Sequence, residues 1–367
     1  MSTLKVNSIQ HSNGTDALTI DSTGHATFNK TFIPANPLTN RNLIINGDMR
    51  IDQRNAGSAV TVNANSVFWP LDRFHAVGVG SAGVFTAQQV SDAPDGGDKS
   101  LKFTVTTTAS TGAYRFHYNV EGNHVAHLGF GQSWAKTFTL SFWVKSSVTG
   151  TYSGSFRNSA HDRSYVFEYT IDTANTWERK TITITADTTG TWLTDNGSGL
   201  KIIWGLGGAV SGTVGSWQSG NYFTSTNQTE WIATSGATFY ISQIQLEVGD
   251  TATPFEHLPY DVQLARCQRY YQTPFGNGCI GHWDSTTQIW WGVRYYCEMR
   301  ATPSVTLLNT ALTIRHNGNK TSSGSAIYFT ELSQTGASIA INGWTGGTTV
   351  QFAVLRTDKS ASFSAEL

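Results

Sequence analysis

Charged residues are scarce in this chain. They make up 13% of 367 residues, and 24 Lys and Arg nearly balance 25 Asp and Glu, whereas about a quarter of the residues in an ordinary soluble domain are charged. Binding to nucleic acid requires a surplus of cationic side chains to neutralise phosphates, and a net charge of −1 does not supply one. Nucleic acid is therefore not expected as a partner.

The chain also lacks long apolar runs and has few cysteines. No apolar run approaches the roughly 18 residues that a membrane-spanning helix needs. The opening MSTLKVNSIQ lacks the apolar stretch of a secretory signal peptide, so we expect synthesis and folding in a cytoplasm. The cysteines form an odd set, Cys267, Cys279 and Cys297, and we expect reduced, buried thiols rather than a disulfide or a metal site.

Glycine, threonine, serine and aromatic residues are abundant instead. The chain has 36 Gly, and 12% of its residues are Phe, Trp or Tyr. Short runs rich in β-branched and aromatic residues recur between turns of Gly, Ser and Asn, and this pattern predicts an all-β fold. The length favours two or three domains, and the composition along the chain divides it into residues 1–38, 39–258 and 259–367.

Residues 1–38 form a small β-rich unit in this prediction. Three short strands are expected at residues 4–10, 17–20 and 25–28. So small a sheet cannot build a core by itself and needs a partner, which self-association around a symmetry axis would supply. The prolines Pro34 and Pro37 then predict a stiff linker to the next domain.

The domain at residues 39–258 has alternating strands. In the run TFTLSFWVKS the residues with one orientation are apolar and those with the other are mostly polar; the apolar set is Phe138, Leu140, Phe142 and Val144. A second run places Tyr114, Phe116 and Tyr118 on one side and Arg115, His117 and Asn119 on the other. Further strands are predicted at residues 101–107, 165–171, 178–185 and 200–206. So many short strands separated by turns predict two packed sheets.

The stretch from residue 239 to residue 271 joins the middle domain to the last one. It begins as an alternating strand with a bulge at the adjoining polar pair Ser242 and Gln243, and Gly249 and Pro254 then break the chain. Asp261 is predicted to cap a helix of about three turns, which is the one convincing helix in the sequence. Residues 259–367 then continue as strands.

Several segments resemble bacteriophage tail fibres. The run STLKVNSIQ with ALTIDSTGHATF is similar to the N-terminal segment of tail fibres, particularly from marine phages, and QLEVGDTATPFE, ARCQRYYQ, MRATPSVT and SFSAEL are similar to later parts of the same family. The resemblance implies a homotrimeric structural protein in the tail fibre of the virion. It implies attachment to the phage tail or an adaptor protein through residues 1–38, and distal contact with a host-surface glycan or an outer-membrane receptor.

The middle domain is similar to jelly-roll carbohydrate-binding modules. The landmarks are NLIINGD as an opening strand, GGDKSL, SFWVKS and a closing QIQLE. The resemblance implies a concave face that holds Trp143, Arg115 and His117, where a sugar ring stacks on the indole and polar groups orient its hydroxyls. The alternative is that this face packs on a neighbouring subunit or a second layer.

The last domain is dense in aromatic residues, which suit a receptor-binding tip or a subunit interface. The candidate tip residues are Trp290, Trp291, Tyr295, Tyr296 and Trp344. Because consecutive strand residues face opposite sides, one member of each adjacent pair is expected in the core and the other on the surface.

Catalytic and metal-binding patterns are not evident. The sequence has no G-x-S-x-G nucleophile motif, and no carboxylate pair is singled out for glycoside hydrolysis. Asp48 matches an acidic position that holds calcium in the modules, but Met49, Arg50, Ser242 and Gln243 stand where further oxygen ligands are expected. We therefore expect no enzyme, no cofactor and no metal. A stand-alone carbohydrate-binding protein and a surface-polysaccharide depolymerase are the alternatives.

Overall fold

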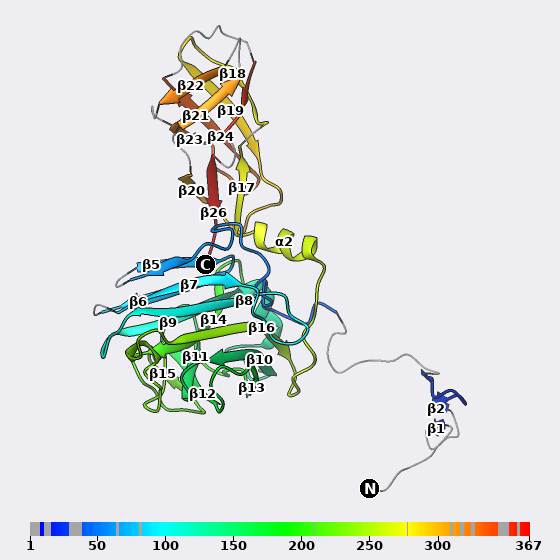
Figure 1. Ribbon diagram of the computed structural model, residues 1–367. Helices are drawn as coiled ribbons and strands as arrows, with labels where there is room; N and C mark the ends of the chain where they lie inside the picture. The colour runs from blue at the N-terminus through cyan, green and yellow to red at the C-terminus, as the bar shows by residue number, and fades with distance from the viewer. Residues whose placement is uncertain are drawn as a thin grey trace. The chain divides into compact units, whose positions relative to one another are not determined.

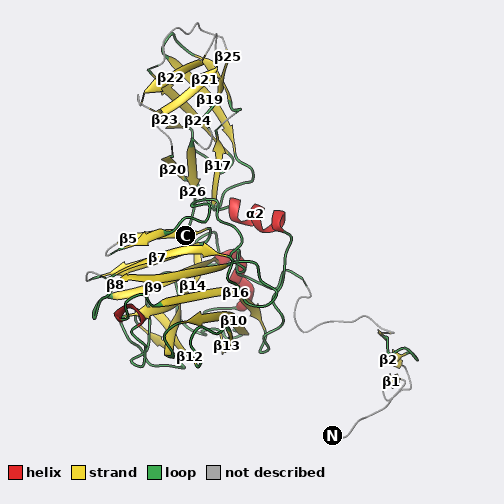
Figure 2. Cartoon of the chain, viewed as in Figure 1, coloured by secondary structure: helices red, strands yellow, loops and turns green. Residues whose placement is uncertain are grey.

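The computed structural model describes residues 8–10, 16–28, 39–63, 66–80, 83–208, 210–276, 278–308, 311–315, 319–323, 327–343, 352–357 and 360–367. The chain divides into two compact units, Met1–Arg41 and Asn42–Leu367. Strands dominate the described residues (Figure 2), and the all-β prediction is confirmed. The expected boundaries at residues 38 and 258 stay predictions.

The first unit contains a small antiparallel sheet in its described part. Its order is β1 (Ser8–Gln10), β2 (Asp16–Ile20) and β3 (Ala26–Phe28). The carboxylate of Asp21 closes the turn between β2 and β3 by accepting hydrogen bonds from the backbone N–H groups of Thr23 and His25, both at 2.9 Å. Residues 1–7 and the predicted proline linker lie outside the described residues.

The second unit begins with two antiparallel sheets that face each other (Figure 1). In the described residues the first sheet has six strands, in the order β13 (Glu178–Thr185), β10 (Thr137–Ser146), β16 (Thr238–Val248), β8 (Ser100–Thr107), β7 (Val84–Val90) and β4 (Val60–Val62). The second has seven described strands, in the order β15 (Trp217–Ser219), β12 (Arg163–Ile171), β11 (Gly150–Arg157), β14 (Ser198–Gly207), β9 (Ala113–Glu121), β6 (Phe74–Val79) and β5 (Ser66–Leu71). Neighbours far apart in sequence, such as β14 beside β9, give a jelly-roll-like sandwich.

One apolar core lies between the two sheets. Phe116 of the seven-stranded sheet stacks on Trp204 at 5.0 Å between ring centroids, and on Phe103 of the opposite sheet at 4.8 Å. The predicted inward row of β10 is confirmed, because its apolar residues are buried in this core; they are Phe138, Leu140, Phe142 and Val144. Thr139 and Ser141 of the opposite row, predicted as the polar face, are buried as well. The alternation arises because successive strand side chains point to opposite faces of a sheet.

The two ends of the sandwich sequence meet at β16. The predicted bulge is confirmed, because Gln243 has a φ of 48° and the register of β10 against β16 shifts between Ser141 and Trp143. The opening NLIINGD was predicted as a strand, and that prediction is wrong. The segment is a turn in which the Asn42 amide donates to the Ile244 carbonyl at 3.0 Å and its oxygen accepts from Leu246 N–H at 3.1 Å.

The C-terminal part of the second unit has its own core and two sheets. In the described residues the small sheet has the order β17 (Tyr271–Phe275), β26 (Ala361–Ser364) and β20 (Ser304–Leu307). The larger has the order β22 (Asn319–Ser323), β21 (Ala311–Arg315), β25 (Phe352–Leu355), β18 (Ile280–Trp283), β19 (Gln288–Arg294), β24 (Gly336–Asn342) and β23 (Ile327–Thr330). Phe275, Trp283, Trp291 and Phe363 are among the residues of their common core.

Helices are short in the described chain. The predicted helix is present as α2 (Tyr260–Gln268), but Asp261 does not cap it, because the helix begins after Pro259 and Asp261 lies in its first turn. Its buried residues are Gln263 and Cys267. The other helices in the described residues are α1 (Gly122–Val125), η1 (Ala126–Leu128) and η2 (Trp231–Ala233). No helix in the described residues is both long and apolar enough to cross a bilayer. All three cysteines are free thiols, and Cys267 alone is buried.

Ion pairs with buried carboxylates connect the sandwich to the C-terminal part of the unit. Glu366 forms an ion pair with Arg73 of the sandwich. The Oε1 atom of Glu366 also lies 2.9 Å from Arg54 Nη2. A second pair joins Arg269 to Glu121 at 2.6 Å, and the Tyr270 hydroxyl donates to the same carboxylate at 2.6 Å. These contacts place the end of the described chain beside β5 (Figure 1).

Candidate functional site

A groove of about 410 Å³ lies on the outer face of the seven-stranded sheet. Its floor comes from β5, β6, β9, β14 and β11, and the loops after β11 and β15 and the chain's last residue border it. The lining residues are Val67, Trp69, His75, Val77, Arg115, His117, Asn119, Arg157, His161, Lys201, Asn221, Phe223 and Leu367.

Strand register sets the floor of the groove. Because Tyr114, Phe116 and Tyr118 point into the core, their neighbours on β9 point outward. His117 lies opposite His75 of β6, and Asn119 lies opposite Lys201 of β14. Lys201 in turn lies opposite Arg157 of β11. Two cross-strand rows therefore lie side by side, one containing imidazole rings and the other amide and cationic groups.

Aromatic rings line one side of the groove. The Trp69 ring lies 4.8 Å from the His75 ring, and the His75 ring lies 4.7 Å from that of His117. On the other side, the Phe223 ring has Arg115 at 4.1 Å and Arg157 at 4.5 Å from its centroid. Flat ring surfaces and hydrogen-bond donors thus line the same groove.

Three cations, Arg115, Arg157 and Lys201, converge on the groove. Arg115 Nε donates to His117 Nε2 at 2.9 Å, and Lys201 Nζ lies 2.8 Å from His161 Nε2. Burial lowers the pKa of Arg115 and of Arg157 to about 10, so both are protonated at neutral pH. Among the described residues, no carboxylate of another residue forms an ion pair with any of the three.

The groove histidines are neutral. Burial, and then the charges of Lys201, Arg73 and Arg115, lower the pKa of His75 to about 3. Burial and then nearby charges also lower the pKa of His117 well below its ordinary value. Neutral imidazole both donates and accepts hydrogen bonds, so these rings serve as flat polar surfaces rather than as cations.

We predict that stability falls in mild acid partly because of His75. The pKa of His75 in the folded state lies below its unfolded value of 6.5. The stability that the neutral ring contributes is therefore complete above pH 6.5 and is lost as the pH falls toward 3. The slope for one such group is about 1.4 kcal/mol per pH unit. In urea unfolding, His75→Phe should reduce the loss of stability between pH 6.5 and 5 by about 1–2 kcal/mol. His282→Phe, at an exposed position of β18, is the control, and an equal loss in wild type and His75→Phe would contradict the prediction.

The loop that carries Phe223 is fixed to the sheet by buried polar contacts. Gln228 Oε1 accepts hydrogen bonds from Ser153 N–H at 2.8 Å and from Ser153 Oγ at 2.6 Å. Ser225 N–H donates to the same Ser153 hydroxyl at 2.9 Å. The close approach requires glycine beneath the loop, because a Cβ on Gly205 would lie 2.5 Å from Thr224 Cγ2.

The structure brings together two of the three residues that were predicted to bind a glycan. Arg115 and His117 lie in the groove, but Trp143 lies on β10 of the other sheet, opposite Arg179 and Ser242. The two sheets turn their outer faces away from each other, so the expectation of one face holding all three is wrong. The reason is strand order, because β9 neighbours β14 and β6 rather than β10.

The sequence analysis did not predict several of the residues that line the groove. Trp69, Arg157, Lys201 and Phe223 come from three strands and a loop that are distant along the chain. Lys201 follows the apolar Leu200 and precedes Ile202, so its outward orientation was readable from alternation. Its proximity to Arg157 depended on the pairing of β11 with β14, which no local pattern specifies.

The predicted tip residues divide into buried and more exposed members, with the tryptophans on β19 and the tyrosines just after its end. Trp291 is 1% exposed in the core and Trp290 is half-buried, while Tyr295 is buried and Tyr296 is 61% exposed. The opposite orientation of each pair is confirmed. Trp344 lies outside the described residues, and contact with a receptor stays a prediction.

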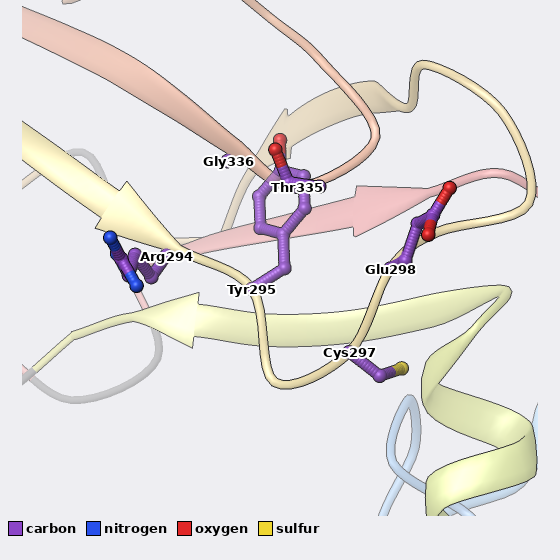
Figure 3. A pocket seen from close by; sticks show the side chains of 6 residues that line it. All are labelled: Arg294, Tyr295, Cys297, Glu298, Thr335 and Gly336. Carbon is purple, nitrogen blue, oxygen red and sulfur yellow. The ribbon is translucent and has the colours of Figure 1, made fainter.

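A second, open pocket of about 510 Å³ lies beside Tyr295 in the C-terminal part. In Figure 3 the Tyr295 ring stands between Arg294 and Glu298, with Thr335 behind it. Burial raises the pKa of the Cys297 thiol, whose Sγ lies 3.7 Å from the Ala265 carbonyl. A raised pKa disfavours the nucleophilic thiolate, so this pocket offers no activated group.

Acidic residues do not gather into a metal site in the described residues, where no group of three or more His, Cys, Asp or Glu is placed to hold an ion. Asp48 Oδ2 accepts from Arg50 Nε at 2.5 Å.

No protein-family model and no curated protein matches the chain. Solved structures that are similar include the enzymatically active domain of tailspike protein 4 of bacteriophage CBA120, at 12% identity over 57% of this chain and 21% of that one, with a TM-score of 0.33. The carbohydrate-binding module TmCBM61 in complex with β-1,4-galactotriose is 10% identical over 57% of this chain and 99% of that one, with a TM-score of 0.29. A family 11 carbohydrate-binding module from Clostridium thermocellum is 15% identical over 51% and 96%, with a TM-score of 0.28.

Proposed function

We propose that the chain is a subunit of a bacteriophage tail fibre that binds a host-surface glycan in the groove of its sandwich. The observation that carries the glycan part is the groove itself. The rings of Trp69, His75 and His117 follow one another on one side, and Arg157 and Lys201 offer donors on the other. A sugar has an apolar ring face that stacks on such rings and hydroxyls that such donors orient.

The fibre part of the proposal is supported by the sequence. The segments at both ends and after the sandwich resemble tail fibres, and the small sheet at residues 8–28 has too few residues for a core of its own. In the proposal, three chains associate, residues 1–38 attach the fibre to the tail or an adaptor protein, and the protein is located in the virion.

The groove favours binding over glycan cleavage. Glycoside hydrolysis usually requires two carboxylates across the scissile bond. The described residues that line the groove include no Asp or Glu. We therefore propose a structural, receptor-binding role rather than that of a depolymerase.

Adsorption of phage particles to host cells tests both parts of the proposal. Particles whose fibre carries Trp69→Ala should keep the fibre but adsorb about 10-fold less, because one stacking surface is lost. Trp134→Ala is the matched control, since Trp134 is 55% exposed outside the groove. Particles assembled with a chain lacking residues 1–38 should carry no fibre.

Two outcomes would contradict the proposal. Normal adsorption of Trp69→Ala particles would remove the groove from the function. Particles that never contain this chain, together with a monomeric mass by light scattering, would indicate a stand-alone carbohydrate-binding protein.

A further inference from the structure

We infer that the ligand of the groove is an acidic glycan, in which a carboxylate or sulfate group of the sugar pairs with Arg157 and Lys201. The inference rests on the proposed glycan-binding function and specifies the class of sugar. Neither the stacking surface nor the fold requires a charged ligand, so the inference depends on how the groove's cations are arranged.

The first observation concerns the burial and the hydrogen bonding of Arg157. Its side chain is 3% exposed, yet its Nε and Nη1 atoms have no hydrogen-bond partner. A buried charge without a partner is unfavourable by several kcal/mol. The guanidinium presents its N–H groups in a fork that matches the two oxygens of a carboxylate or sulfate. Because Arg157 lines the groove, an anion that enters it would lie beside a guanidinium to which the described residues give no carboxylate.

The buried Arg73 and the half-buried Arg163 of this unit provide the contrast. Arg73 pairs with Glu366, and Arg163 Nε lies 2.6 Å from Asp187 Oδ2. The protein thus supplies internal carboxylates where a buried guanidinium is structural. Arg157 has no such carboxylate among the described residues, and its guanidinium lies over the Phe223 ring, which it shares with Arg115.

The positions of the charges agree with one binding mode. Arg157 on β11 and Lys201 on β14 are directly opposite in register, while the ring surfaces belong to β9, β6 and β5. A sugar ring stacked on the aromatic side would therefore direct its acidic substituent toward the β14–β11 side. The cations of the groove, Arg115, Arg157 and Lys201, are among the groups that, after burial, lower the pKa of His117.

Calorimetric titration of the full chain tests this inference with three probes: oligogalacturonate, which carries carboxylates, sulfated dextran oligomers, and neutral dextran oligomers. We expect an acidic probe to bind at least 10-fold more tightly than the neutral one. Arg157→Gln should weaken the acidic probe about 10-fold or more, the usual value of a hydrogen bond to a charged group. Arg179→Gln, on the outer face of the other sheet, should leave it unchanged. Lys201→Met, at a less buried position, gives the same test if Arg157→Gln does not fold.

Each outcome of the titration either supports or overturns the inference of an acidic glycan. Binding of the carboxylated probe alone, or of the sulfated probe alone, supports the inference and identifies the acid. Neutral probes that bind as tightly as acidic ones, with loss on Trp69→Ala, would overturn the acidic ligand but leave glycan binding intact. Acidic binding that Arg179→Gln weakens as much as Arg157→Gln does would show general attraction and overturn the site. No binding by any probe would contradict both proposals.

Discussion

Replacing Glu366 with alanine is expected to destabilise the second unit by about 3–5 kcal/mol. Arg73, the partner of Glu366, is 1% exposed, and the Tyr270 ring lies 3.5 Å below its guanidinium. Burial alone would lower the pKa of Arg73, but the charge of Glu366, together with Tyr118 and Tyr270, outweighs burial and raises that pKa. Without the carboxylate, Arg73 keeps a buried charge with no counterion, and this accounts for the size of the effect.

Urea unfolding of the purified chain measures this prediction. Glu298→Ala, at an exposed carboxylate of the same domain, is the matched control and should change stability by less than about 0.5 kcal/mol. The double variant Arg73→Met with Glu366→Leu should regain much of the lost stability, because it removes the charge that has no partner. A loss below about 1 kcal/mol in Glu366→Ala would show that the pair is not the connection we infer.

Replacing Gly205 with valine should detach the loop that carries Phe223 and with it weaken glycan binding. A side chain on Gly205 would collide with Thr224 Cγ2 and would also lie 3.0 Å from Gln228 Oε1, the atom that holds the loop to Ser153. Overpacking of this kind costs about 1–3 kcal/mol. We expect relief of the collision through movement of the loop, since the sheet below it is fixed by hydrogen bonds on both sides.

Hydrogen exchange and calorimetry together measure the loop movement and the weaker glycan binding expected of Gly205→Val. The amide of Ser225, which donates to Ser153 Oγ, should exchange faster in Gly205→Val, and glycan affinity should fall about 10-fold as Phe223 leaves the groove. Gly292→Val is the control, because a Cβ there meets nothing within 4 Å in an exposed strand position. Unchanged exchange at Ser225 with normal affinity would mean that the loop tolerates the side chain.

The helix α2 shows why one prediction held only in part. Its location followed from apolar spacing after a proline turn, but Gln263 and Cys267 are the residues it buries. The Gln263 amide oxygen accepts from Asn46 N–H at 3.2 Å, which satisfies a polar group inside the protein. A polar residue that becomes buried through such a partner cannot be distinguished, in sequence, from one that faces water.

Within single strands, the sequence by itself determined which residues face the core. The buried row of β10 and the outward Arg115 and His117 of β9 both follow from an alternation that each strand encodes locally. Only the tertiary structure decided which strands are neighbours, because hydrogen-bond pairing joins segments that are distant along the chain and depends on how both sheets enclose one core. That pairing separated Trp143 from Arg115, and it brought Arg157, Lys201 and Trp69 to the groove. The composition of the proposed site is therefore a property of strand order.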